Sequence, residues 1–153
     1  MDMVKKLALL LVLAPAAVWA DGLSLTIGPP VAAQLATPEK KFFATLALRI
    51  NGCADLSKAH LTAMGEGLVG DERRSVPTPP AATQIAGTYM VSRQWRNEGK
   101  WVVAVTVTCA SETAAAIVPV RSDNIIREGI QMLTHAPTKA EIDAALKAVN
   151  PPQ

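Results

Sequence analysis

Apolar and polar side chains alternate along several short stretches of the chain, and the clearest alternation runs through residues 41–50. Five apolar side chains of this stretch share one face: Phe42, Ala44, Leu46, Leu48 and Ile50. A period of two residues is typical of a half-buried β-strand. Residues 23–27 alternate in the same way until Gly28-Pro29-Pro30, which predicts a first strand at the edge of a sheet.

Two longer apolar stretches flank the sequence Asn97-Glu98-Gly99-Lys100. Because Asn and Gly favour turn conformations, residues 88–95 and 101–109 are predicted to form a β-hairpin. The second arm places its large apolar side chains on one face, together with its cysteine: Trp101, Val103, Val105, Val107 and Cys109. We therefore expect Cys109 to face the core.

Further strands are expected at residues 59–64, after the polar turn that begins at Asp71, and at residues 114–120. Gly65, Gly67 and Gly70 follow the first of these stretches and interrupt its pattern. The run Pro77-Thr78-Pro79-Pro80 is a connection, since proline cannot donate to a sheet ladder. About seven short strands joined by Gly/Pro-rich turns favour a sandwich over an open sheet. We expect a mainly β protein, with an immunoglobulin-like β-sandwich over residues 21–121.

The period changes near the end of the chain. Thr138-Lys139-Ala140-Glu141 is a capping-box sequence, and a helical apolar face follows it until Pro151: Ile142, Ala145, Leu146 and Val149. Residues 122–135 remain ambiguous, because their apolar side chains have helical spacing while Gly129 interrupts it. Residues 122–153 are thus predicted to be a C-terminal helical extension.

The first twenty residues have a different pattern, that of a secretory signal. Lys5 and Lys6 precede an apolar run over residues 7–14, and small side chains stand at Val18 and Ala20. The alternatives are a buried helix or a membrane anchor, but the uncharged stretch is shorter than the roughly 20 residues that a spanning helix needs. We expect cleavage after Ala20, no stable membrane anchor after cleavage, and a location in the periplasm or outside the cell.

Charge does little to suggest a partner. Residues 21–153 hold 13 basic and 12 acidic side chains, and the basic ones are scattered along the sequence and interleaved with acids. A nucleic-acid-binding protein needs a concentrated basic face. Nucleic acid is therefore excluded as an expected partner.

Cys53 and Cys109 are the only cysteines. In a chain sent to an oxidising compartment they are expected to form a disulfide. The alternative is a redox-active or metal-binding pair, but such cysteines usually lie close together in sequence, as in C-x-x-C.

Residues 58–120 contain four short segments with a shared likeness: Ala63-Met64-Gly65-Glu66-Gly67-Leu68, Arg73-Arg74, Gly87-Thr88-Tyr89-x-Val91 and Glu98-Gly99-x-Trp101-Val102-Val103. These segments resemble extracytoplasmic immunoglobulin-like domains of the YtkA/FixH type. Some members of that family are associated with copper handling or with the assembly of respiratory complexes, through His and Met residues on a loop. His60 and Met64 stand where this loop would be.

Export to an oxidising compartment makes copper the candidate metal. Cu(I) in an oxidising compartment favours thioether and imidazole ligands, and the chain offers five candidates: His60, Met64, Met90, Met132 and His135. The alternative is that the methionines fill gaps in the core and the histidines are ordinary surface residues.

No motif predicts catalysis, and we expect that the protein is not an enzyme. Neither histidine lies in a nucleophile motif such as G-x-S-x-G. The spacing of Gly65-x-Gly67-x-x-Gly70 matches a dinucleotide-binding pattern, but a polar turn and a strand follow it instead of a helix.

The remaining hypothesis is an interaction protein without a cofactor. Trp95 either packs in the core or is displayed to a partner near the tip of the predicted hairpin. Ile142 and Leu146 belong to a helix that either docks on the sandwich or binds a partner. We expect an exported accessory or binding protein that acts through another envelope protein, with copper binding or delivery as the alternative.

Overall fold

The computed structural model describes residues 22–30 and 44–149. Ten strands lie within these ranges: β1 Ser24–Gly28, β2 Ala44–Asn51, β3 His60–Val69, β4 Glu72–Pro77, β5 Ala81–Ala82, β6 Thr88–Ser92, β7 Lys100–Cys109, β8 Glu112–Arg121, β9 Asn124–Ile125 and β10 Gln131–Leu133. One α-helix, α1, spans Lys139–Ala148, and two 3₁₀ turns span Leu56–Lys58 and Arg127–Gly129. The expected signal at residues 1–20 lies outside the described residues. No helix in the described part of the chain has the length and apolar character needed to cross a membrane.

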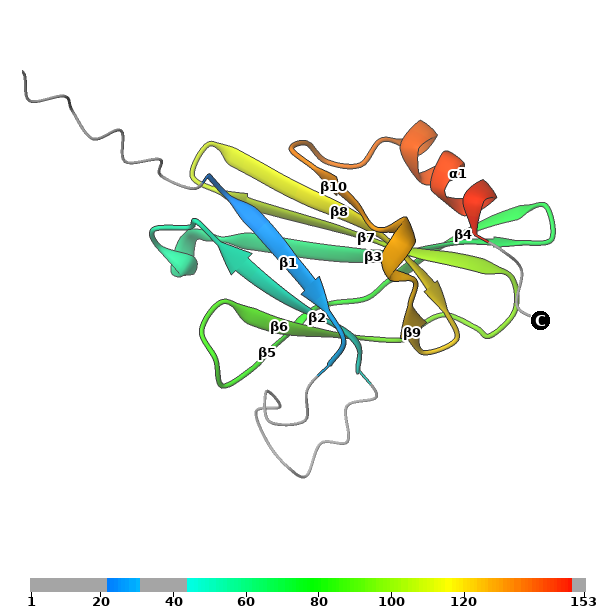
Figure 1. Ribbon diagram of the computed structural model, residues 1–153, viewed down its shortest axis with the longest axis horizontal. Helices are drawn as coiled ribbons and strands as arrows, with labels where there is room; N and C mark the ends of the chain where they lie inside the picture. The colour runs from blue at the N-terminus through cyan, green and yellow to red at the C-terminus, as the bar shows by residue number, and fades with distance from the viewer. Residues whose placement is uncertain (1–21, 31–43, 150–153) are drawn as a thin grey trace, which may run out of the picture.

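The strands form two antiparallel sheets that pack face to face (Figure 1). The four-stranded sheet has the order β1-β2-β6-β5, and the six-stranded sheet has the order β10-β8-β7-β3-β4, with β9 paired to β8. The predicted β-sandwich with a C-terminal helix is confirmed. Three short strands, β5, β9 and β10, were not predicted from the sequence. Each has too few residues to show an alternation of apolar and polar side chains.

The core between the sheets comes from the alternating faces of β2 and β7. Leu46 and Leu48 of β2 are fully buried, as are Val103, Val105 and Val107 of β7. Both strands therefore have the face that the period of two predicted, and Cys109 is buried at the end of β7.

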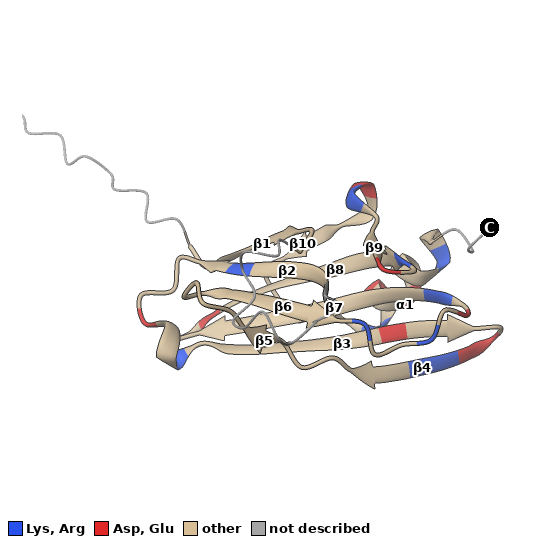
Figure 2. Cartoon of the chain, turned by 90° about the horizontal axis from the view of Figure 1, so that it is seen from below, with Lys and Arg blue, Asp and Glu red and all other residues tan. Residues whose placement is uncertain are grey.

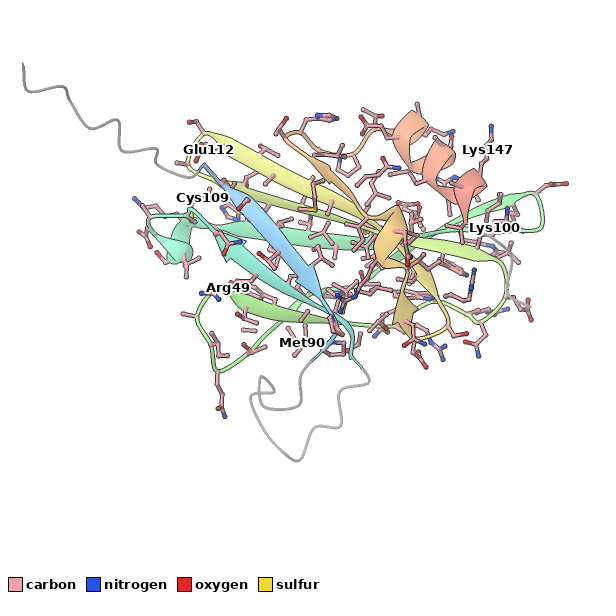
Figure 3. The ribbon with its side chains drawn as sticks, viewed as in Figure 1. Arg49, Met90, Lys100, Cys109, Glu112 and Lys147 are labelled. Carbon is pink, nitrogen blue, oxygen red and sulfur yellow. A yellow bond between two sulfur atoms is a disulfide. The ribbon has the colours of Figure 1, made fainter. Side chains whose placement is uncertain are left out.

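The predicted disulfide is present between Cys53 and Cys109, whose Cα atoms lie 5.9 Å apart. Cys53 follows the end of β2, and Cys109 ends β7. The bond therefore joins the two sheets at one end of the sandwich, opposite the end that carries Lys100 and Lys147 (Figure 3).

The predicted hairpin of residues 88–109 is wrong. β6 pairs with β2 and β5 in the four-stranded sheet, whereas β7 pairs with β3 and β8 in the six-stranded sheet. The connection between β6 and β7 crosses from one sheet to the other and buries Trp95 on the way. The actual hairpin partner of β7 is β8, reached through Ala110 at φ +54°.

The glycines of β3 do not interrupt the strand, which also corrects the sequence-based expectation. β3 continues through Gly65 and Gly67 to Val69 and pairs with β7 along this length. A Cβ atom on Gly67 would lie 2.5 Å from the ring of Trp101, and one on Gly65 would lie 3.1 Å from the ring of Trp95. These glycines leave room for two indole rings.

The helix α1 packs on the outer face of the six-stranded sheet. Its capping box is complete, because the Thr138 hydroxyl accepts from the Glu141 backbone N–H and the Glu141 carboxylate accepts from the Thr138 backbone N–H. The apolar face of the helix covers Val102 and Ile117. The ambiguous residues 122–135 form β9, a 3₁₀ turn and β10 instead of a helix.

Candidate functional site

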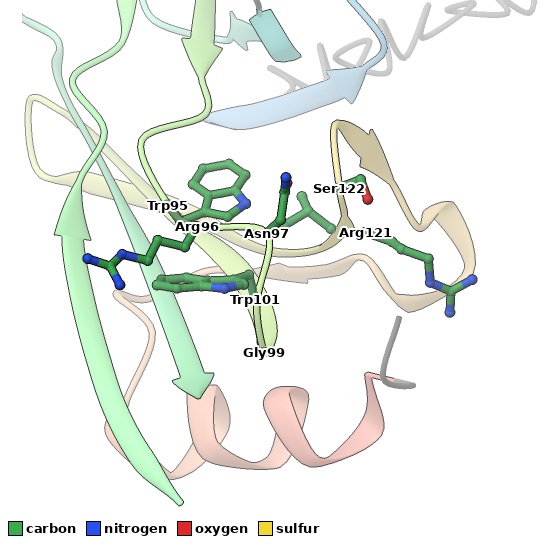
Figure 4. Close-up of a pocket in the computed structure, with 8 residues that line it drawn as sticks. Trp95, Arg96, Asn97, Gly99, Trp101, Arg121 and Ser122 are labelled. Atoms are coloured by element: carbon green, nitrogen blue, oxygen red, sulfur yellow. The ribbon is translucent and has the colours of Figure 1, made fainter. Parts of the chain in front are cut away.

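Two tryptophans from different elements stack on each other (Figure 4), and Trp101 follows Lys100 at the end of the sandwich away from the disulfide (Figure 3). Trp95 comes from the connection between the sheets, and Trp101 is the second residue of β7. Their ring centroids are 6.3 Å apart and their planes differ by 26°. Each of the two residues is buried, with 5% of its surface exposed.

The turn before β7 holds Trp101 in place. The Trp101 Nε1–H donates to the carbonyl oxygen of Glu98 at 2.7 Å. Gly99 has φ +86°, and a Cβ atom there would lie 2.5 Å from the Leu68 carbonyl oxygen. Only glycine fits this position, because the conformation is strained for other residues and the neighbouring backbone leaves no space.

A cavity of about 180 Å³ lies between the tryptophan pair and the edge strand β4. Arg74 and Val76 line it from β4, and Arg96 and Glu98 line it from the connection between the sheets. On the other side of the tryptophan pair a space of about 10 Å³ adjoins Arg121. That space is at the lower limit of what can hold one water molecule, so of these two spaces only the larger cavity can accept a side chain.

Charged groups of both signs surround this cavity. Arg74 lies 2.9 Å from the carboxylate of Glu72, and both side chains are exposed. Arg96 and Arg121 form no ion pair within residues 22–30 and 44–149. They extend to opposite sides of the tryptophan pair, and Arg96 extends toward β4 (Figure 4). The cavity is thus lined by two guanidinium groups and one carboxylate, that of Glu98.

More widely, charged residues are frequent in the half of the molecule that contains β4, β9 and α1 (Figure 2). Arg74 and Arg96 are distant in sequence, and nothing in their spacing indicated that they would line one cavity. The sequence signal that was available is the Glu98-Gly99-x-Trp101 segment, which positions the turn.

The three interaction candidates are core residues in the described conformation. Trp95 packs between the sheets. Ile142 and Leu146 are 8% and 1% exposed and pack against Val102 and Ile117 on the six-stranded sheet. None of the three presents a broad apolar surface to a partner, because each is needed for intramolecular packing.

The five candidate copper ligands are not brought together. His60 and Met64 share the outer face of β3, but four residues along a strand span about 13 Å. Met132 lies on β10, with β8 and β7 between it and β3, and Met90 is buried in the other sheet. In the described ranges no three His, Cys, Asp or Glu side chains are grouped to hold a metal ion.

His135 has a different partner. Its Nε2 lies 2.7 Å from the Glu141 carboxylate of the capping box. The backbone hydrogen bond from Thr138, followed by the hydrogen bond with His135, lowers the pKa of Glu141. On the same helix, the hydrogen bond from Lys139 lowers the pKa of Asp143. Arg73 Nε also lies 2.9 Å from Asp143, which links β4 to α1.

Comparisons of the chain with protein-family models, with curated proteins and with solved structures found no match.

Proposed function

We propose that the chain is an exported, non-catalytic accessory protein of the periplasm or cell envelope that acts by binding another protein. The observation that carries this proposal is the cavity between the Trp95–Trp101 pair and β4, which Arg96 borders without an ion-pair partner in the described part of the chain. Arginine is enriched at the energetic centres of protein interfaces. Binding residues on connections that a rigid sandwich positions are also common.

Two further features support the location. Residues 1–20 have the charge, apolar run and small residues of a secretory signal. The Cys53–Cys109 disulfide suits an oxidising compartment, where such bonds form and persist. The resemblance of residues 58–120 to YtkA/FixH-type domains agrees with this location, and we propose that relationship on fold-level patterns alone.

The cysteines and the histidines take no part in the proposed binding. Both cysteines are bonded to each other, and His135 is bonded to the capping box of α1. His60 lies exposed on the outer face of β3, away from the cavity.

Site-specific photo-crosslinking in living bacteria tests this proposal. The full chain is produced with a photoreactive amino acid in place of Arg96, and the matched control carries it in place of Arg49. Arg49 is an exposed arginine of β2 near the disulfide end of the sandwich (Figure 3). We expect a polypeptide adduct of discrete mass from position 96 in the periplasmic fraction and none from position 49. Equal adducts at the two positions, or none at position 96, would contradict the proposal.

A further inference from the structure

We propose that the partner binds as an extended acidic segment of polypeptide, which adds to the free edge of β4 and places a carboxylate in the cavity beside Arg96. The inference rests on the proposed function, because it names the chemistry and the binding mode of the partner.

The first supporting feature is the edge itself. β4 is the last strand of the six-stranded sheet and, among the described strands, pairs only with β3. An edge strand presents unpaired N–H and C=O groups on its outer side, which form a template for another extended chain. With six residues, β4 offers the longest edge of this sheet, since β10 at the other edge has three.

The second feature is the position of the cavity relative to that edge. Arg74 and Val76 alternate with Arg73 and Ser75 along β4, so the first two side chains lie on the inner face and line the cavity. A strand added to β4 continues the pleat, and every second side chain then lies on this inner face. Binding by strand addition gains affinity from main-chain hydrogen bonds and specificity from pockets for alternate side chains.

The third feature is charge. Arg96 borders the cavity with no ion pair in the part of the chain that the structure describes, while Arg74 is paired with Glu72. A carboxylate from a partner gives Arg96 a charge-assisted hydrogen-bond acceptor in a planar geometry that guanidinium groups favour. Glu98 lines the same cavity, and its carboxylate repels other negative charges. A partner with one acidic side chain at a defined position is therefore favoured over a partner with many closely spaced negative charges.

An anionic polysaccharide shares the negative charge but not the peptide backbone. It lacks the regularly spaced N–H and C=O groups that would form a continuous ladder with the edge of β4. The edge therefore favours a polypeptide, and the polysaccharide becomes an outcome to be distinguished by experiment.

Residues 21–153 with the disulfide formed provide a direct optical test. Apart from Trp19 in the expected signal, Trp95 and Trp101 are the only tryptophans, so tryptophan fluorescence reports on the cavity. The probe, called the Thr-Glu peptide, is an acetylated and amidated decapeptide of Thr in which a single Glu replaces one central residue. Three comparison probes are the same peptide with Gln in place of Glu, the same peptide with alternate backbone amides N-methylated, and polygalacturonate.

We expect the Thr-Glu peptide to change the fluorescence saturably and to slow hydrogen exchange of β4 amides. The Gln peptide should bind about tenfold more weakly, because it lacks the charge-assisted interaction with Arg96. The N-methylated peptide should also bind about tenfold more weakly, because it cannot pair fully with the edge of β4. Arg96→Gln should weaken binding of the Thr-Glu peptide by a similar factor, whereas Arg49→Gln should leave it unchanged.

Equal binding of the Gln peptide would overturn the acidic partner, and equal binding of the N-methylated peptide would overturn strand addition. Tighter binding of polygalacturonate at the same site would replace the polypeptide by a polysaccharide. Self-association that protects β4 would identify a second copy of the chain as the occupant and overturn the inference. If no peptide binds while position 96 still crosslinks to a polypeptide in cells, the inference fails and the proposed function stands. If position 96 does not crosslink, the proposed function fails.

Discussion

Trp101 of β7 lies directly opposite Gly67 of β3, and its indole ring covers the place that a Cβ atom on residue 67 would take. The ring atoms would lie 2.5 Å from that Cβ atom, closer than carbon atoms approach without displacement. Gly67 therefore determines where the indole lies, and with it one wall of the cavity beside β4.

Gly67→Ala should destabilise the protein, because the added methyl group forces Trp101 out of its packed position. Overpacking of this kind costs about 1–3 kcal/mol in the free energy of unfolding, which urea unfolding followed by circular dichroism measures. Gly28→Ala is the matched control, since a Cβ atom on Gly28 meets nothing within 4 Å. Equal stability of the two variants would contradict this role of Gly67.

Replacing both cysteines by alanine should lower the free energy of unfolding by about 4 kcal/mol, according to the chain-entropy model for a loop of this length. The cysteines are 56 residues apart in sequence, so the bond restricts a long segment of the unfolded chain. Thermal and urea unfolding with and without reductant measure the effect. Reductant should destabilise the parent protein to the level of the double variant and leave the double variant unchanged; any other pattern would count against a purely structural bond.

Leu146→Ala should also be strongly destabilising. The side chain is 1% exposed and fills the contact between α1 and the six-stranded sheet, and a Leu→Ala change in a core costs about 2–5 kcal/mol. Lys147→Ala on the exposed side of the same helix is the control, with little effect expected. If both variants unfold at the parent midpoint, the helix does not dock as described.

Acid should weaken the start of α1 through Glu141. Its pKa is lowered in the folded protein by the Thr138 backbone hydrogen bond and by His135. A lowered folded-state pKa contributes stability that is present above the unfolded-state value and is lost as the pH falls through the folded-state value. With a reference value of 4.5 for the glutamate, the loss should occur below that pH.

The comparison of the parent with Glu141→Gln measures this contribution by urea unfolding across the acidic range. The variant should lose less stability than the parent as the pH falls, because it has no carboxylate to protonate. Glu128→Gln is the control, since the Glu128 carboxylate forms no hydrogen bond or ion pair with the described residues. An identical acid response of the parent and Glu141→Gln would show that the capping carboxylate is not the group that matters.

Local patterns in the sequence were sufficient for the features that depend on neighbours along the chain. The alternation in residues 41–50 and 101–109 predicted β2 and β7 with the correct buried faces, because a strand that covers a core must alternate. The capping box at Thr138 predicted the start of α1, because its hydrogen bonds join residues three positions apart. The cysteine count and the signal pattern predicted the disulfide.

Only the tertiary structure decided which sheet each strand joined and what the glycines and arginines do there. A period of two shows which face is buried but not which strand lies alongside, so β6 and β7 looked like a hairpin although they belong to different sheets. Gly67 looked like a break because the ring that requires it comes from another strand. Arg74 and Arg96 looked like separate surface charges, and the packing of two sheets around Trp95 is what brings them to one cavity.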